Sequence, residues 1–87
     1  MSDWKWDYSP SEEHLTAGLP VGVVTEVERI ATELAALGHD AETAGTRPEG
    51  KPGGLRNFPV FGGRGFIQCL AVPRHECVYV CAIVWTG

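Results

Sequence analysis

Two apolar runs near the end of the chain are typical of neighbouring β-strands. Residues 66–72 and 77–85 are rich in β-branched and aromatic residues, which are enriched in strands. Between them stand Pro73, Arg74, His75 and Glu76, a composition typical of a turn. The pattern predicts an antiparallel hairpin.

The side chains of this hairpin separate into two faces if Val72 pairs with Cys77, because successive strand residues point to opposite sides of a sheet. One face is then wholly apolar, and we expect helices to bury it; it holds Ile67, Cys69, Ala71, Val78, Val80, Ala82 and Val84. The other face is mixed and partly open; it holds Phe66, Gln68, Leu70, Val72, Cys77, Tyr79, Cys81, Ile83 and Trp85. The same register places Arg64 on the open face near Trp85, where we expect a functional site.

The first part of the chain predicts another strand and a short helix. Residues 4–8 alternate strictly, with Trp4, Trp6 and Tyr8 on one face, which is the period of a strand. A helix is expected to begin around Ser9 and Pro10. It is short, because Gly18 and Pro20 stop it.

A second helix is predicted over residues 21–37. Apolar side chains recur there every three or four positions, which gives the helix one apolar stripe. The stripe consists of Val23, Val27, Ile30, Leu34 and Leu37. We expect it to pack on the apolar face of the sheet, although a partner-binding surface would show the same pattern.

Residues 39–54 are rich in Gly, Pro, Thr and charged residues. They predict a long loop carrying Arg47 and Lys51, which is either functional or a plain connection. Residues 55–61 follow as a strand. Because Pro59 cannot donate a hydrogen bond to a neighbouring strand, we expect an edge strand or a bulge.

The expected order of elements is therefore strand, helix, helix and three strands. Helices followed by a run of strands are typical of an α+β fold with a mostly antiparallel sheet. We expect this β-α-α-β-β-β chain to pack its two helices on one face of the sheet. Its 87 residues form a single domain, residues 1–87, since this length leaves no room for a second core.

Composition indicates a globular protein of the cytoplasm. No apolar run is long enough to span a membrane, and the first residues lack a secretory signal pattern. Three cysteines, all in the predicted hairpin, are typical of buried thiols in a reduced compartment rather than of a disulfide framework. A cluster of Cys69, His75 and Cys77 is a conceivable metal site, but we expect neither a metal nor a cofactor.

Charge is unevenly distributed along the chain, whose net charge is −4. Residues 1–46 contain nine carboxylates against Lys5 and Arg29, a balance of −7, whereas residues 47–87 have a balance of +3. The basic residues of this second part are Arg47, Lys51, Arg56, Arg64 and Arg74. Such a basic region either meets an anion locally or consists of solvated loop and turn charges.

The element order and several short motifs resemble the RelE/ParE toxin superfamily over nearly the whole chain. The motifs are Gly54-Leu55-Arg56-Asn57-Phe58, Gly63-Arg64-Gly65-Phe66-Ile67 and the apolar end Ile83-Val84-Trp85. The resemblance implies a toxin of a type II toxin–antitoxin system, held inactive by a cognate antitoxin. Members similar to RelE cleave mRNA on the ribosome, whereas others similar to ParE inhibit DNA gyrase.

The resemblance also implies site residues. Arg64 matches an arginine that contacts the scissile phosphate, and Arg56 matches one that is structural or phosphate-facing. Guanidinium groups suit this role because attack by a 2′-hydroxyl builds negative charge on the phosphate. Cleavage further needs a base and an acid. The resemblance does not supply Tyr79, which we add to the predicted catalytic set from its place on the mixed face; the same place suits an acid, a stacking ring or a packed residue. The predicted substrate-binding residues are Lys51, Arg47, Arg74 and His75.

The chain departs from the nuclease pattern at its end. Trp85-Thr86-Gly87 lacks the Arg/Tyr or His/Tyr pair that the nuclease branch places at or beyond the last strand. Three hypotheses therefore stay open. The leading one is an mRNA endonuclease; the others are a non-catalytic gyrase inhibitor and a catalytically degenerate interaction module.

Overall fold

The computed structural model describes residues 3–43, 45 and 55–86. In chain order the elements are β1 (Lys5–Tyr8), α1 (Glu12–Thr16), α2 (Val21–Leu37), a 3-10 helix (Gly38–Thr43), β2 (Leu55–Val60), β3 (Gly65–Val72) and β4 (Cys77–Trp85), with short 3-10 turns at Phe61–Gly63 and Pro73–His75. The predicted helix 21–37 and strand 77–85 are confirmed. The loop predicted over 39–54 begins instead with the 3-10 helix, and the rest of it, apart from Gly45, lies outside the described residues.

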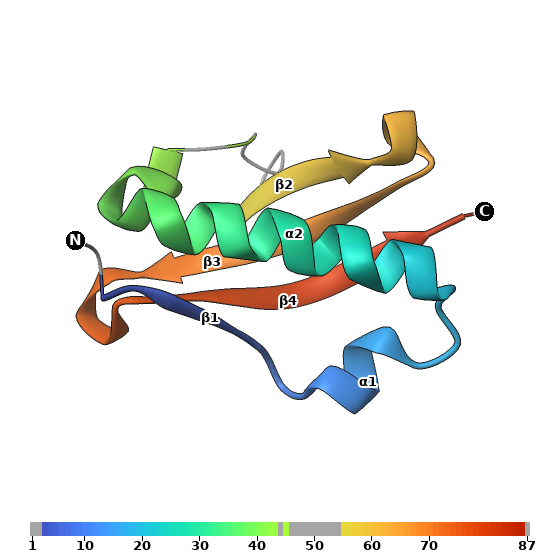
Figure 1. The fold of residues 1–87 in the computed structure, drawn as a ribbon, viewed down its shortest axis with the longest axis horizontal. Coiled ribbons are helices and arrows are strands. Elements are labelled where there is room, and N and C mark those ends of the chain that lie inside the picture. Colours follow the sequence, from blue (N-terminus) through green and yellow to red (C-terminus); the bar gives the residue numbers. More distant parts are fainter. Residues whose placement is uncertain (1–2, 44, 46–54, 87) are drawn as a thin grey trace.

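The four strands form one mixed sheet in the order β1-β4-β3-β2 (Figure 1). The β2–β3 and β3–β4 pairs are antiparallel, whereas β1 runs parallel to β4. Parallel neighbours need a crossover connection, and the chain between β1 and β4 includes α2, which crosses the sheet. The predicted α+β class and the mostly antiparallel sheet are therefore confirmed.

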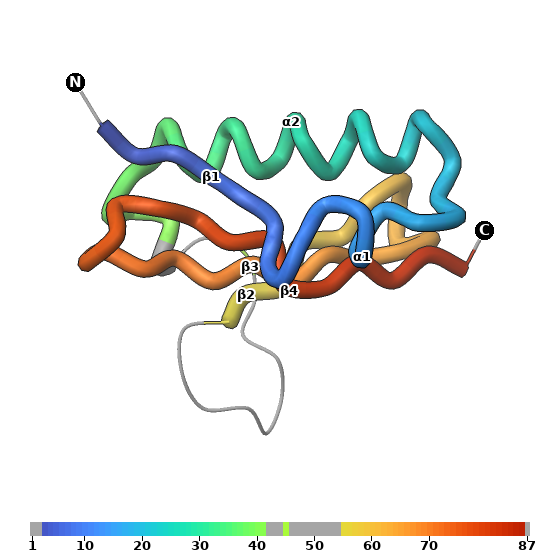
Figure 2. Tube along the Cα trace, turned by 90° about the horizontal axis from the view of Figure 1, so that it is seen from below, coloured from blue at the N-terminus to red at the C-terminus, as the bar shows by residue number. Residues whose placement is uncertain are grey.

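A single main helix, α2, covers one face of the sheet. Figure 2 shows α2 running over the strands, with α1 near their level. Helix α1 has 5 residues, and none of them is buried. It begins after Ser11, whose hydroxyl accepts a hydrogen bond from the His14 N–H at 3.2 Å. The expectation of two helices packed on this face is only half correct, because α1 is too short to carry an apolar stripe.

The core lies between α2 and the sheet face beneath it. Four residues of the predicted stripe are buried: Val23, Val27, Ile30 and Leu34. They meet the strand residues Tyr8, Val60, Ile67, Cys69, Val78 and Val80. Burying an aliphatic side chain of this size contributes about 1.5–3 kcal/mol, so this layer is the main source of stability. Leu37, at the last position of the helix, is 48% exposed, contrary to the prediction.

A β-bulge in β4 changes which residues of the hairpin face the core. At the turn, Val72 pairs with Cys77 as predicted. A regular ladder would then pair Gln68 with Cys81, but Gln68 pairs with Ala82. Cys81 is therefore an extra residue on β4, and one inserted residue reverses the alternation of all side chains beyond it.

Beyond this bulge the predicted faces are wrong. Ile83 and Trp85, predicted for the open face, pack against the core. Val84, predicted to be buried, is 40% exposed, and Ala82 lies on the same side of the sheet as Val84. Arg64 lies near Trp85 as expected, but on the α2 side and not on the open face: both residues line a hollow together with residues of α2. Periodicity alone assumes an unbroken ladder, so it cannot show such an inversion.

Strand β2 lies at the edge of the sheet, one of the two positions that Pro59 allows. Its register with β3 is uninterrupted, and Arg56 pairs with Cys69. No bulge therefore reverses this strand, and Arg56 lies on the α2 side with Cys69. The strand ends at Val60, one residue earlier than predicted, because Phe61 starts the turn into β3 with a positive φ of 48°.

Truncation of Ile83 tests the exchanged faces. We expect Ile83→Ala to lower the free energy of unfolding by about 2 kcal/mol, because it removes packed methyl groups from the core. Val84→Ala, the matched control at the next position, is expected to lower it by less than about 1 kcal/mol. Urea denaturation followed by circular dichroism measures both values. A larger loss for Val84→Ala would contradict the bulge.

Candidate functional site

A hydrogen bond joins His75 and Tyr79 at the β3–β4 turn. The His75 Nδ1 and the Tyr79 hydroxyl are 2.9 Å apart, and the two rings meet edge to face with centroids 5.9 Å apart. The hydroxyl donates when Nδ1 carries no proton and accepts when it does. His75 is exposed and Tyr79 is partly exposed, so the pair can exchange a proton with a bound molecule.

Local structure brings these two residues together. His75 ends the 3-10 turn Pro73–His75, and Glu76 then takes a left-handed conformation with a φ of 48° that directs the chain into β4. Tyr79 follows before the bulge, and its neighbours Val78 and Val80 belong to the core. Tyr79 therefore lies on the face away from α2, on the same side as the turn residue that it contacts.

Strand β1 adds two charged residues to this corner. Lys5 lies opposite Cys77, and Asp7 lies opposite Tyr79, so these side chains share the face away from α2. Arg74, in the turn, is exposed. These basic, acidic, thiol and phenol groups are together termed the turn corner: Lys5, Asp7, Arg74, His75, Cys77 and Tyr79.

The surroundings raise the pKa of Tyr79. Desolvation is the largest cause, and the Cys77 thiol and the Asp7 carboxylate add to it. The pKa of Cys77 is also raised, mainly because the thiol is buried, while a hydrogen bond to Tyr79 and the charge of Lys5 oppose this rise. Tyr79 therefore keeps its proton at neutral pH and can serve as a proton donor.

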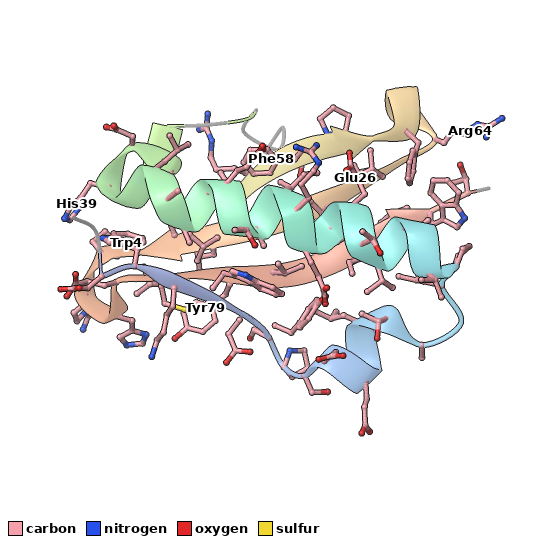
Figure 3. All side chains as sticks on the ribbon, in the orientation of Figure 1. Trp4, Glu26, His39, Phe58, Arg64 and Tyr79 are labelled. Carbon is pink, nitrogen blue, oxygen red and sulfur yellow. The ribbon has the colours of Figure 1, made fainter. Side chains whose placement is uncertain are left out.

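Arg64 lies at the other end of the sheet, in the β2–β3 turn. Its carbonyl accepts hydrogen bonds from the Thr86 N–H at 3.1 Å and from the Thr86 hydroxyl at 2.6 Å, which ties the turn to the residue after β4. The Arg64 side chain projects outward (Figure 3) and borders a hollow of about 500 Å³, termed the α2 hollow. The other lining residues are Pro20, Gly22, Val23, Phe61 and Trp85.

The three residues predicted to be catalytic do not meet. Arg64 and Tyr79 lie toward opposite ends of the sheet (Figure 3). Between those ends runs β3, whose 8 residues span roughly 25 Å. Arg56 lies on the α2 side and donates a hydrogen bond to the Gly45 carbonyl at 2.9 Å. No single phosphate can contact all three side chains in this arrangement.

The predicted substrate-binding residues are divided too. Arg74 and His75 both lie in the β3–β4 turn, and His75 contacts Tyr79. Arg47 and Lys51 lie outside the described residues.

Sequence reasoning missed the contribution of β1 to the turn corner. Alternation shows that Lys5 and Asp7 share a face, but it does not show which strand lies beside them. The same holds for the contact between His75 and Tyr79, because the side-chain direction in the turn depends on its 3-10 conformation. The one usable signal was the short spacing of these two residues across a predicted turn.

Metal binding finds no support in the described residues, which contain no group of three His, Cys, Asp or Glu side chains placed to hold an ion. The conceivable Cys69–His75–Cys77 cluster is not formed. Cys69 belongs to the core beneath α2, whereas Cys77 points to the opposite face.

Comparisons with protein-family models, with curated proteins and with solved structures find no match for this chain. In the part of the chain that the structure describes, no helix is both long enough and apolar enough to cross a membrane. The chemistry of the turn corner and of the α2 hollow is therefore the basis for functional inference.

The buried thiol of Cys69 leads to a prediction of how the free energy of unfolding depends on pH. Burial raises the pKa of Cys69 from an ordinary value of 9.0 to about 12, so the folded state holds this proton more tightly than the unfolded chain does. The resulting stabilisation is present below about pH 9 and is lost as the pH rises toward 12. We expect the free energy of unfolding, measured by urea denaturation, to fall over this range and to fall less in Cys69→Ala. A stability that stays constant or rises would contradict the burial of this thiol.

Proposed function

We propose that this chain is the toxin of a type II toxin–antitoxin pair of the RelE/ParE kind. In this proposal it cleaves mRNA on the ribosome, in the cytoplasm, and a cognate antitoxin holds it inactive. The observation that carries the proposal is the 2.9 Å hydrogen bond between His75 and Tyr79. In this proposal it takes the place of the His/Tyr pair that the end of the sequence lacks. The α+β element order and the short motifs around Arg56 and Arg64 support it further.

Cleavage at the turn corner follows ordinary ribonuclease chemistry. The 2′-hydroxyl of the RNA attacks the adjacent phosphorus and gives its proton to His75, while the departing 5′-oxygen takes a proton from Tyr79. The products are a 2′,3′-cyclic phosphate and a 5′-hydroxyl. The hydrogen bond between the two side chains then returns the proton from His75 to Tyr79 and restores both groups.

Positive charge at the reacting phosphate comes from the turn corner itself. Arg74 precedes His75 in the turn, and Lys5 lies opposite Cys77 on β1. Cations placed where negative charge develops stabilise the transition state. Arg64 is too distant to contact the same phosphate, so in this proposal it acts elsewhere on the protein.

A second candidate function is a toxin without catalysis, acting as a gyrase inhibitor or as an interaction module. The separation of Arg64, Arg56 and Tyr79 favours it, because a binding protein needs no assembled catalytic set. The two candidates differ in one expectation. A non-catalytic toxin keeps its effect when Tyr79 loses its hydroxyl.

The test is to induce the chain in a bacterial host and to follow methionine and thymidine incorporation together, with mapping of mRNA ends. We expect protein synthesis to stop while DNA synthesis continues. Tyr79→Phe and His75→Ala are each expected to slow mRNA cleavage about a hundredfold or more, because each removes a proton-transfer group. Arg29→Ala is the matched control: Arg29 is an exposed helix residue that pairs with Glu26 and Glu33, and it is expected to cleave like the parent chain.

Other outcomes would redirect or reject the proposal. Early arrest of DNA synthesis, with full effect in Tyr79→Phe, would support the gyrase inhibitor. Loss of cleavage in Arg64→Ala with full cleavage in both turn-corner variants would place catalysis at the α2 hollow. Normal incorporation of both precursors, with soluble protein accumulating, would reject a toxin.

A further inference from the structure

The α2 hollow lies where α2 begins, and most of its wall is apolar. Phe61 and Trp85 meet edge to face in this wall, with ring centroids 5.6 Å apart and planes at 72°. Val23, a core residue, lines the side toward α2. Phe61 leaves 47% of its surface exposed. Exposed aromatic surface in a concave place is typical of a binding site.

The backbone holds Phe61 in an uncommon conformation. Its φ is 48°, in the left-handed region that bulky side chains rarely adopt. Such a conformation costs about 1–3 kcal/mol and is concentrated at functional sites. The ring of Phe61 is thus presented at the hollow despite local backbone strain.

The hollow also has a cation at its rim, where the Arg64 side chain projects outward (Figure 3). In the described part of the chain, the guanidinium of Arg64 has no ion-pair or hydrogen-bond partner. Helix α2 starts after Pro20 with no side-chain cap and no acidic residue in its first turn, so the positive end of its dipole is not compensated. At Gly22 an added Cβ would meet no atom within 4 Å apart from its chain neighbours and the helix's own backbone, so other described elements leave this point of the helix surface open.

We propose that the α2 hollow binds an acidic peptide segment of a partner protein. An apolar side chain of the segment enters the aromatic wall of Phe61 and Trp85, and a neighbouring carboxylate pairs with Arg64 at the start of α2. Binding sites of this kind combine a buried apolar anchor with a charged contact at the rim.

A peptide fits this hollow better than a nucleic acid does. Nucleic-acid interfaces carry many positive charges, whereas Arg64 is the one charged residue among the described residues that line the hollow. The proposal does not depend on RNA cleavage at the turn corner, which lies at the other end of the sheet.

Three short synthetic peptides test this site on the full chain labelled with nitrogen-15. One alternates glutamate and leucine, one alternates lysine and leucine, and one alternates glutamate and serine. Nuclear magnetic resonance follows the Trp85 indole N–H and the backbone N–H groups of Gly22 and Val23. We expect the glutamate–leucine peptide to shift these signals to saturation, and each of the other two, which lacks the charge or the anchor, to shift them little at equal concentration.

Variants separate the charge contact from a general effect on folding. Arg64→Ala is expected to weaken binding of the glutamate–leucine peptide about tenfold, because a charge-assisted contact is lost. Arg64→Lys keeps the charge and is expected to lose less. Arg29→Ala, an arginine of α2 outside the hollow, is expected to bind like the parent chain, and the dispersion of the amide signals reports whether each variant is folded.

Three results would overturn the proposal. The first is an equal loss of affinity in folded Arg64→Ala and Arg29→Ala. The second is a set of peptide-induced shifts confined to the turn corner. The third is a short single-stranded RNA that shifts the Trp85 signal at a lower concentration than the peptide does, which would assign the hollow to nucleic acid. None of these results tests cleavage by His75 and Tyr79.

Discussion

The packing of α2 on one face of the sheet is the interaction on which the rest of the structure depends. At its centre, Val27, Ile67, Val78 and Val80 are fully buried. A chain of 87 residues supports one modest core, and among the described helices only α2 is long enough to cover it. Among the described residues, no helix as long as α2 covers the opposite face of the sheet.

The bulge at Cys81 determines what the two ends of the sheet contain. Before the bulge, β4 directs Tyr79 away from α2, toward His75. After it, β4 directs Trp85 toward α2, where the indole forms part of the aromatic wall beside Phe61. Without the extra residue, Trp85 would share the face of Tyr79 and the hollow would lose half of that wall. The single extra residue in β4 thus places Tyr79 and Trp85 on opposite faces of the sheet, one at the turn corner and the other at the α2 hollow.

The turn corner and the α2 hollow contain different chemical groups. The turn corner has a hydrogen-bonded His75–Tyr79 pair, with Lys5 and Asp7 on the neighbouring strand and Arg74 in the turn. The α2 hollow has a cation and an aromatic wall, but its described lining contains no group that gives or takes a proton near neutral pH. We therefore propose proton transfer at the turn corner and binding of an apolar, acidic segment at the α2 hollow.

The sequence by itself determined α2, β4 and the pairing of Val72 with Cys77, and through Pro59 it restricted β2 to a sheet edge or a bulge. Periodicity, turn composition and proline are local properties, so they can be read from the chain alone. It also singled out the arginines and the tyrosine as candidates. Their arrangement was decided only by the tertiary structure, since a register shift of one residue and the parallel pairing of β1 with β4 join residues far apart in the chain. The register shift turns Trp85 toward α2 beside Arg64, and the parallel pairing places Lys5 and Asp7 next to Cys77 and Tyr79.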